Sequence, residues 1–550
     1  MVVPELRPWR AAGPRVARAA GPRVARAAGP RVARAARAVR PRLARAARAA
    51  KPRVARFARA TAPQLTRITR PKTWQYTAGA ATAGLALAAG VVTAAGPWDS
   101  TGQRTAERDR AVALERTGGA DHGGGADGSG ATSGSPRPAP SAPSVLTGLG
   151  GTSGGVPRGA EAVPGGTPLP DVLGPLMEDP ALGGSRGAAV VDLTTGKHLY
   201  GRGADTALTP ASTTKIATAV AALTALGPEH RLTTRTALEA DTGELVLVGG
   251  GDPTLTARKD ARGLASLRTL AEKTAAALKK RDVREVTLSY DTTLYAGTEM
   301  HPIGVNENLA RVTALMADEA RTDDSTSGPA PRVPDPADAA ARAFAGFLER
   351  HGITASAPGP SKATDRADTL ATVSSPQLSA LVERMLTNSD NDIAEALARH
   401  TAVASGESAD FDGVSAAITA RLEQLGLPVG GARFHDGSGL DRTDRITAGL
   451  LTALLAEAAD PSRPELRPVL TGLPVAGFTG TLSGRYTDGA AGVVRAKTGT
   501  LTGVNTLAGT VVTPDGRLLG FAFLASDTTN AWEAQAALDR LTTALASGAP

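Results

Sequence analysis

A run of apolar and small residues, long enough for a buried helix, is the clearest pattern in this chain. It covers residues 210–226 and consists mostly of Ala, Thr, Val, Leu and Ile, with a proline at its start and a Gly-Pro pair after its end. Proline suits the first turn of a helix, and Gly followed by Pro stops one. Between Asp205 and Glu229 the only formal charge is Lys215. The pattern therefore predicts a buried helix that carries one ammonium group.

Short apolar runs on both sides of this helix predict the strands of one sheet. A first pair lies at 188–193 and 197–200, and three more runs lie near the C-terminus, followed by a helix over about 529–545. Together the five runs predict a five-stranded antiparallel sheet flanked by helices, which is an α+β fold. The three C-terminal runs cover 493–496, 506–512 and 518–524.

A second set of strand and helix patterns interrupts this sheet in the chain. It predicts an inserted domain at 231–370, between the two parts of one larger domain at 167–230 and 371–550. The strand patterns continue into turns rich in glycine and charged residues, as expected for a separate folded unit. The patterns are a strand at 244–248, a helix at 262–280 and a strand at 286–291.

The first 166 residues lack the pattern of a folded domain. Residues 1–73 repeat Gly-Pro-Arg-Val-Ala-Arg-Ala-Ala and have few large apolar side chains, which predicts a disordered basic tail. Residues 74–98 carry no charge and have aromatic residues near both ends, which predicts a transmembrane signal anchor. Residues 99–166 are rich in Gly, Ser and Pro, which predicts a flexible linker.

These segments predict a single-pass protein of the cell membrane with its folded part on the extracytoplasmic side. Positive charge before a span keeps that side in the cytoplasm. The alternative is a secreted protein, because Val92-Thr93-Ala94 satisfies the small-residue rule for signal-peptide cleavage. The chain has no cysteine, so disulfides and thiolate metal sites are excluded.

The net charge of +8 alone is typical of a nucleic-acid-binding protein, but the positive charge is not spread over the whole chain. Residues 1–73 alone carry +19, and the rest of the chain carries −11. The basic tail lacks interleaved aromatic residues and precedes the predicted span, so we expect no specific nucleic-acid partner. Nucleic-acid binding through the tail stays an alternative function.

Lys215 is the first candidate for chemistry. A buried ammonium loses its hydration unless it is paired or gives up its proton, and a lysine of lowered pKa can act as a base. Ser212 lies three residues earlier on the same helical face, in the first turn, where backbone N–H groups can stabilise an anion. This arrangement predicts a serine nucleophile with a neighbouring base. The alternative is a surface helix whose Lys215 reaches solvent.

Two further motifs follow in the chain. Ser389-Asp390-Asn391 lies at the break between two apolar-periodic helices, and Lys497-Thr498-Gly499-Thr500 ends the strand-like run 493–496. The order S-x-x-K, S-x-N and K-T-G resembles the active-site serine penicillin-recognising enzymes. With the runs Gly249–Leu255 and Asp436–Leu440, the chain resembles the low-molecular-mass class C penicillin-binding proteins of the peptidase S13 group.

The resemblance covers about 170–545 and implies a serine-type D-Ala-D-Ala carboxypeptidase or endopeptidase that forms an acyl-enzyme. It implies peptidoglycan stem peptides ending in D-Ala-D-Ala as substrates and β-lactams as inhibitors, without cofactor or metal. The implied catalytic residues are Ser212 as nucleophile, Lys215 as base, Ser389, Asn391 and Lys497. The implied substrate-binding residues are Thr498, Gly499, Thr500, Asp291 and Tyr295.

Asp291 and Tyr295 belong to a segment that resembles the part of some relatives where an Asp and an aromatic residue face the stem peptide. Asp291 is therefore expected to bind an amino group of the substrate, and the alternative is a turn at the end of a strand. A serine β-lactamase-type hydrolase shares the three motifs and stays an alternative function. The 177 residues between Ser212 and Ser389 are far more than a class A enzyme allows, and no E-x-E-L-N loop is recognisable.

Overall fold

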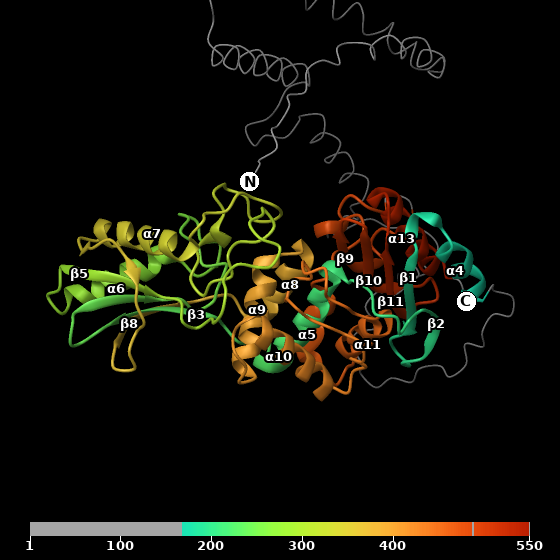
Figure 1. The fold of residues 1–550 in the computed structure, drawn as a ribbon, viewed down its shortest axis with the longest axis horizontal. Helices are drawn as coiled ribbons and strands as arrows, with labels where there is room; N and C mark the ends of the chain where they lie inside the picture. The colour runs from blue at the N-terminus through green and yellow to red at the C-terminus, as the bar shows by residue number, and fades with distance from the viewer. Residues whose placement is uncertain (1–167, 487–488, 549–550) are drawn as a thin grey trace, which may run out of the picture. The chain divides into compact units, whose positions relative to one another are not determined.

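The predicted five-stranded antiparallel sheet is present in the computed structural model, which describes residues 168–486 and 489–548. Its strand order is β2-β1-β11-β10-β9. β1 pairs with β11 along its whole length, so segments from opposite ends of the described chain lie side by side in teal and red (Figure 1). The strands are β1 (Ser185–Asp192), β2 (His198–Arg202), β9 (Val494–Leu501), β10 (Val504–Val512) and β11 (Leu518–Ser526).

Helices cover both faces of this sheet. Alternate side chains of β11 point to opposite faces, as a strand requires, so Leu524 joins the core around α5, whereas Phe521 and Phe523 join the core under α4 and α13. The α-helices of this part are α4 (Leu169–Met177), α5 (Thr214–Leu226), α8 (Leu378–Asn388), α9 (Asn391–Ala404), α10 (Phe411–Gln424), α11 (Ala448–Ala459), α12 (Arg467–Thr471) and α13 (Ala531–Ala546).

A second, mixed sheet occupies the chain between α5 and α8. Its order is β6-β5-β4-β3-β8, with β7 also paired to β5, and β4 and β5 run parallel. Leu245, Leu288 and Phe344 are among the side chains that form its core with α6 and α7. The domain boundaries 231–370 stay a prediction. The elements are β3 (Thr233–Leu238), β4 (Glu244–Val248), α6 (Leu267–Lys279), β5 (Glu285–Asp291), α7 (Pro336–Arg350), β6 (Thr354–Ala355), β7 (Gly359–Pro360) and β8 (Asp368–Ser374).

α5 is the buried helix that the apolar run predicts, and every side chain from Thr214 to Leu223 is buried. The expectation of one continuous helix from Pro210 was wrong, because a 3₁₀ helix, η3 (Ala211–Thr213), precedes the α-helix. Ala211 has a φ of +48°, in the left-handed region, which a right-handed helix interior does not permit. The α-helix therefore begins only after this turn, at Thr214.

The start of α6 and the end of β9 also differ from the expectation. α6 begins at Leu267 and not at 262, because Gly263 has a φ of +82° and Ser266 caps the helix with its side chain. β9 continues through the K-T-G motif to Leu501. The apolar run in the sequence predicted instead that the strand covers 493–496 and ends before the motif. The register with β10 explains the extension, since Lys497 to Leu501 pair with Ala508 to Val504.

The predicted tail (1–73), anchor (74–98) and linker (99–166) lie outside the described residues. Within 168–486 and 489–548, the structure has no helix with the length and apolar character that a membrane crossing needs. The membrane location and the secreted alternative therefore stay predictions.

Candidate active site

Ser212 lies in η3, at the entrance to α5, and lines a cavity of about 450 Å³. Two threonine hydroxyls fix this turn through one carbonyl group. Thr213 Oγ1 donates to Pro210 O at 2.7 Å, and Thr506 Oγ1 on β10 donates to the same oxygen at 2.7 Å. The serine hydroxyl is therefore presented to the cavity by a turn that is anchored to the sheet.

Lys215 lies one turn beyond the serine and is completely buried. Its Nζ is 3.0 Å from Ser212 Oγ, 2.7 Å from Asn391 Oδ1 and 2.6 Å from the Ser438 carbonyl oxygen. Burial lowers the pKa of Lys215 to about 8, although nearby carboxylates act in the opposite direction. A substantial fraction of this lysine is therefore neutral near pH 8.

The neighbours of the Lys215 amine decide where its lone pair points. The Ser438 carbonyl and Asn391 Oδ1 can only accept hydrogen bonds. A neutral amine has two hydrogens and one lone pair, so these two acceptors take both hydrogens and leave the lone pair facing Ser212 Oγ. This geometry suits Lys215 as the base that removes the serine proton.

The S-D-N motif forms the junction between α8 and α9. Ser389 ends α8 in the left-handed conformation, with a φ of +57°, which is uncommon for a residue with a side chain. Asp390 caps α9 by accepting a hydrogen bond from Ile393 N at 3.0 Å. Asn391, the first residue of α9, donates through Nδ2 to Asn308 O at 2.9 Å, which directs its Oδ1 to the lysine. The tight junction therefore brings two motif side chains into one cluster.

Lys497 supplies the second buried amine of the cluster. It lies on β9, is completely buried, and donates to Ser389 Oγ at 2.9 Å and to Thr498 O at 2.8 Å. Burial, together with the positive charge of Lys215, holds the pKa of Lys497 well below its usual range. The sequence-predicted residues thus form two hydrogen-bonded groups at one cavity, Lys215 with Ser212 and Asn391, and Lys497 with Ser389.

The rest of the K-T-G-T segment forms one wall of the cavity. Thr498 and Thr500 line it, and Thr498 Oγ1 donates to Thr481 Oγ1 at 2.8 Å. Gly499 points the other way, toward η3. A Cβ at Gly499 would lie 2.6 Å from Pro210 O, which is closer than real Cβ contacts. Glycine at this position therefore allows β9 to approach the turn that holds the nucleophile.

Several residues of the site were not singled out from the sequence. They are isolated polar or apolar residues in loops and on a helix face, so no spacing marks them. The Ser438 carbonyl is also without a signal, because every residue has a carbonyl, although the Asp436–Leu440 motif indicated that this loop matters. The missed residues that line the cavity include Asn308, Thr481, Arg485 and Gln535.

The structure does not bring Asp291 and Tyr295 into this cavity. Asp291 accepts from Thr293 N at 2.8 Å and from Ala363 N at 3.0 Å, so both carboxylate oxygens hold the turn after β5. The Tyr295 hydroxyl donates to Gly251 O at 3.3 Å. These contacts match the alternative of a turn at the end of a strand.

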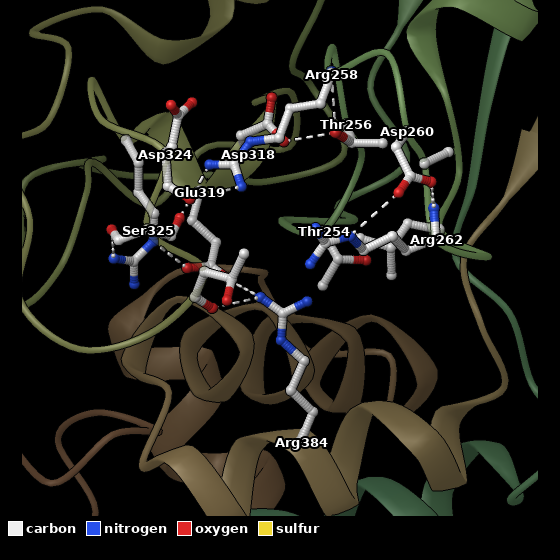
Figure 2. A pocket seen from close by; sticks show the side chains of 14 residues that line it. Thr254, Thr256, Arg258, Asp260, Arg262, Asp318, Glu319, Asp324, Ser325 and Arg384 are labelled. Carbon is white, nitrogen blue, oxygen red and sulfur yellow. Dashed lines mark hydrogen bonds and ion pairs between the residues drawn. The ribbon is translucent and has the colours of Figure 1, made fainter. Parts of the chain in front are cut away.

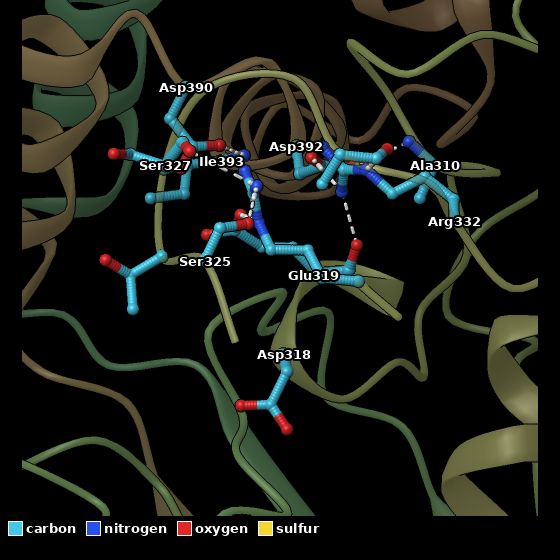
Figure 3. A network of polar contacts seen from close by, with 12 residues as sticks. Ala310, Asp318, Glu319, Ser325, Ser327, Arg332, Asp390, Asp392 and Ile393 are labelled. Carbon is cyan, nitrogen blue, oxygen red and sulfur yellow. Dashed lines mark hydrogen bonds and ion pairs between the residues drawn. The ribbon is translucent and has the colours of Figure 1, made fainter. Parts of the chain in front are cut away.

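The segment between β5 and α7 is fastened to the start of α9 by buried contacts (Figure 3). Arg332 Nη1 donates to Asp392 Oδ2 at 2.8 Å, and Ala310 N donates to Asp392 Oδ1 at 2.9 Å. Burial raises the pKa of Asp392 to about 6, although Arg332 opposes this. Glu319 of the same segment is buried and pairs with Arg384 of α8. These pairs hold the S-D-N junction from the side of the second sheet.

A second cavity, of about 230 Å³, lies among charged residues of both signs (Figure 2). Arg258 is 3.3 Å from Asp318, and Arg262 is 3.3 Å from Asp260. No residue of the S-x-x-K, S-D-N or K-T-G motifs lines this cavity, although Thr254 of the run Gly249–Leu255 does. Its guanidinium groups are paired within the cavity wall, so it is not the catalytic cavity.

Among the residues that the structure describes, two groups of three buried side chains have the spacing to hold a metal ion. In the group of Glu319, Asp390 and Asp392, ion pairs with arginines already engage the carboxylates. In the group of His301, Glu395 and Asp436, backbone N–H groups donate to both carboxylates. These contacts engage the carboxylates without a metal, except that Asp390 Oδ2 accepts no hydrogen bond and has only the Arg384 guanidinium, at 3.8 Å. The groups are Glu319 with Asp390 and Asp392, and His301 with Glu395 and Asp436.

Comparison with known proteins gives the family. Residues 171–322 and 305–545 match the D-Ala-D-Ala carboxypeptidase 3 (S13) family. The chain is 35% identical over 411 residues to the carboxypeptidase Rv3627c of Mycobacterium tuberculosis, covering 72% of this chain and 86% of that protein. It is 29% identical over 439 residues to the D-alanyl-D-alanine carboxypeptidase of Actinomadura sp. strain R39, covering 64% of this chain and 80% of that protein.

The fold has a solved counterpart. The crystal structure of penicillin binding protein 4 (dacB) from Haemophilus influenzae superimposes with a TM-score of 0.56 at 22% identity, covering 68% of this chain and 98% of that one. The expected α+β fold and the expected family are both confirmed. The chain belongs to the peptidase S13 family and is a serine-type D-Ala-D-Ala carboxypeptidase.

Proposed function

We propose that Ser212 Oγ attacks the carbonyl carbon of the penultimate D-Ala of a peptidoglycan stem peptide, while neutral Lys215 takes its proton. The new C–O bond gives a tetrahedral intermediate, whose oxyanion is held by the backbone N–H groups of Ser212 and Thr500. The C–N bond then breaks, the nitrogen takes a proton, and terminal D-Ala leaves an acyl-enzyme. The observation that carries the proposal is the 3.0 Å contact between Lys215 Nζ and Ser212 Oγ beside the cavity.

The other motif residues have supporting roles in this proposal. Ser389 passes a proton to the leaving nitrogen, and its contact with Lys497 Nζ at 2.9 Å keeps its hydroxyl oriented. Asn391 holds the substrate amide near the lysine. Thr498 and Thr500, which line the same cavity, bind the terminal carboxylate of the substrate.

The second half of the reaction frees the enzyme. Water attacks the ester carbonyl, loses a proton to Lys215, and the C–O bond to Ser212 breaks with return of a proton to the hydroxyl. A β-lactam presents its ring amide in place of the D-Ala-D-Ala bond. Because the leaving nitrogen stays tethered to the acyl group, we propose that β-lactams acylate Ser212 and are released slowly.

Labelling of the full-length chain with a fluorescent penicillin tests the assignment. The wild type is expected to carry stable label and to release D-alanine from a pentapeptide ending in D-Ala-D-Ala. Ser212→Ala is expected to lose both, by at least about a thousandfold in rate. Ser462→Ala changes an exposed serine that does not line the cavity, so it is the matched control and is expected to keep both.

The time course of the label separates the alternatives. Loss of label within seconds, with turnover of the drug, would favour a serine β-lactamase-type hydrolase. Labelling of Ser212→Ala at the wild-type rate would overturn the assignment of the nucleophile.

We also propose a membrane location, with the folded part outside the cytoplasm. An uncharged stretch at 74–98 behind a tail of +19 supports this orientation. Fractionation of cells expressing the full chain measures it. Recovery in the medium, shortened at its N-terminus, would support the secreted alternative instead.

A further inference from the structure

A buried histidine connects the segment after β5 to the loop behind the catalytic lysine. His301 Nε2 is 2.9 Å from Asp436 Oδ2, and the two side chains are only 2% and 0% exposed. The residues are 135 positions apart in the chain. Because this contact is buried and joins segments that are distant in the chain, it holds the segment after β5 against the loop that contains Asp436.

The hydrogen bonds of His301 identify its tautomer. Its Nδ1 is 3.1 Å from Ile303 N, a backbone group that can only donate, so Nδ1 is the accepting nitrogen. The ring hydrogen of the neutral imidazole is then on Nε2 and is donated to Asp436. A metal ion at Nε2 would need this hydrogen to be absent, so the tautomer opposes a metal site at this histidine.

Asp436 in turn shapes the loop that follows it. Its Oδ1 accepts from Gly439 N at 2.6 Å, and its Oδ2 accepts from Asp441 N at 2.8 Å and from Ser438 Oγ at 3.1 Å. Glu395 of α9 adds a bond from Ser438 N at 2.9 Å. The backbone at Ser438 is therefore held on both sides, through the N–H of Ser438 and through the N–H of Gly439.

The carbonyl of Ser438 is the acceptor for Lys215 Nζ at 2.6 Å. Together with Asn391 it takes the two hydrogens of the neutral amine and so aims the lone pair at Ser212. A displaced carbonyl would let the amine rotate and point the lone pair away from the serine. Orientation errors of this kind slow a reaction without weakening substrate binding.

We propose that His301 is a positioning residue for Lys215, acting through Asp436 and the Ser438 carbonyl. This inference rests on the proposed function, in which Lys215 is the base for Ser212. It assigns to the segment after β5 a part in orienting the base, although that segment lies outside the three motifs.

Two variants of the full-length chain separate this role from a local structural one. His301→Gln places an amide N–H near the position of Nε2, so it keeps the bond to Asp436 but loses the acceptor for Ile303 N. His301→Asn places its amide oxygen near the position of Nδ1, so it keeps the acceptor but loses Asp436. Only the second change releases the loop that carries the Ser438 carbonyl.

The measurement is the acylation rate constant and the dissociation constant of a fluorescent penicillin, from stopped-flow traces at several drug concentrations. His301→Asn is expected to lower the acylation rate constant at least about tenfold, with an unchanged dissociation constant. His301→Gln is expected to stay within about threefold of the wild type. Wild-type acylation by His301→Asn, or equal slowing by His301→Gln, would overturn the proposal.

Asp436→Asn carries the same test if His301→Asn does not fold. Its side-chain amide has one acceptor oxygen, which cannot accept both from Gly439 N and from the donors at the Oδ2 position, which include His301, so slowed acylation with unchanged binding is again expected. Acylation at the wild-type rate by Asp436→Asn would contradict the inference. Failure of the proposed function itself would appear elsewhere, as unlabelled wild type or as labelled Ser212→Ala.

Discussion

Burial has more influence on the charge of Lys215 than any single neighbour. It brings the pKa to about 8, and Asp436 and Glu395 act against it through their negative charge. A general base works best when its pKa is close to the working pH, because a useful fraction is then neutral and still basic. Burial and the positive charge of Lys215 also hold the pKa of Lys497 well below its usual range.

The pH dependence of acylation follows from this value. Protonated Lys215 cannot take the proton of Ser212, so the rate constant for penicillin labelling is expected to fall as the pH drops below about 8, approaching tenfold per pH unit. Stopped-flow labelling of the full-length chain between pH 6 and 9 measures it. Thermal unfolding over the same range serves as the control for folding. A flat profile from pH 6 to 8 would assign the base to another group.

The motif residues could be predicted because their chemistry requires particular side chains. The residues that orient them could not be predicted, because they act through backbone groups or stand alone in loops. Ser212, Lys215, Ser389, Asn391 and Lys497 need particular functional groups, so their types and order are visible in the sequence. The acceptor that orients the lysine is a carbonyl, which no residue type marks. His301 is also without a pattern, because a single histidine in a loop has no periodic partner.

The approach of β9 to η3 is the contact between elements on which the site depends. Gly499 leaves room for the Pro210 carbonyl, and Thr506 on the neighbouring strand donates to that same oxygen. The sequence predicted a helix and a strand here, but not the 3₁₀ turn or the extension of the strand through Lys497. Both depend on tertiary pairing, which local propensity does not include.

Gly499→Ala is expected to disrupt this contact. The added Cβ would lie 2.1 Å from Thr506 Oγ1 and 2.6 Å from Pro210 O, so β9 must move from η3 at a cost of about 1–3 kcal/mol in unfolding free energy. Penicillin acylation should fall at least about tenfold. Thermal unfolding and labelling measure the two effects.

Gly346→Ala is the matched control, because nothing lies within 4 Å of its added Cβ in the middle of α7. It is expected to leave labelling unchanged and to stabilise the helix by about 0.5–1 kcal/mol. Equal labelling by the Gly499 and Gly346 variants would show that the close approach of β9 is not required.

At the scale of the whole molecule, buried polar links join the segment between β5 and α7 to the helices that carry the motifs. The apolar patterns predicted β4, α6 and β5 of this part, because each has its own periodicity, but they did not single out β3, α7 or β8. They did not predict the links. Arg332 and Asp392 are 60 residues apart, and a charged residue in a loop is read as exposed until its partner is known.

Arg332→Met tests how much one link contributes. It leaves Asp392 buried without its guanidinium, so unfolding free energy should fall by about 3 kcal/mol at pH 8. The loss should be smaller at pH 5, because burial raises the pKa of Asp392 and the protonated form tolerates burial. Urea unfolding at both pH values measures it.

Arg342→Met removes an exposed i,i+4 pair with Asp338 and is the control, with no measurable change in unfolding free energy expected at either pH. A loss for Arg332→Met that is equal at pH 5 and pH 8 would contradict the role given to the Asp392 charge.

The pairing of β1 with β11 has a consequence for biosynthesis. Ser185 and Asp527, which face each other through a hydrogen bond, are 342 residues apart, so β1 leaves the ribosome long before its partner strand exists. Chains grow by roughly 5–20 residues per second, so β1 waits for tens of seconds with an unpaired edge. During this interval β9 is also missing, and the nascent chain cannot yet cut peptidoglycan or react with a β-lactam through a completed site.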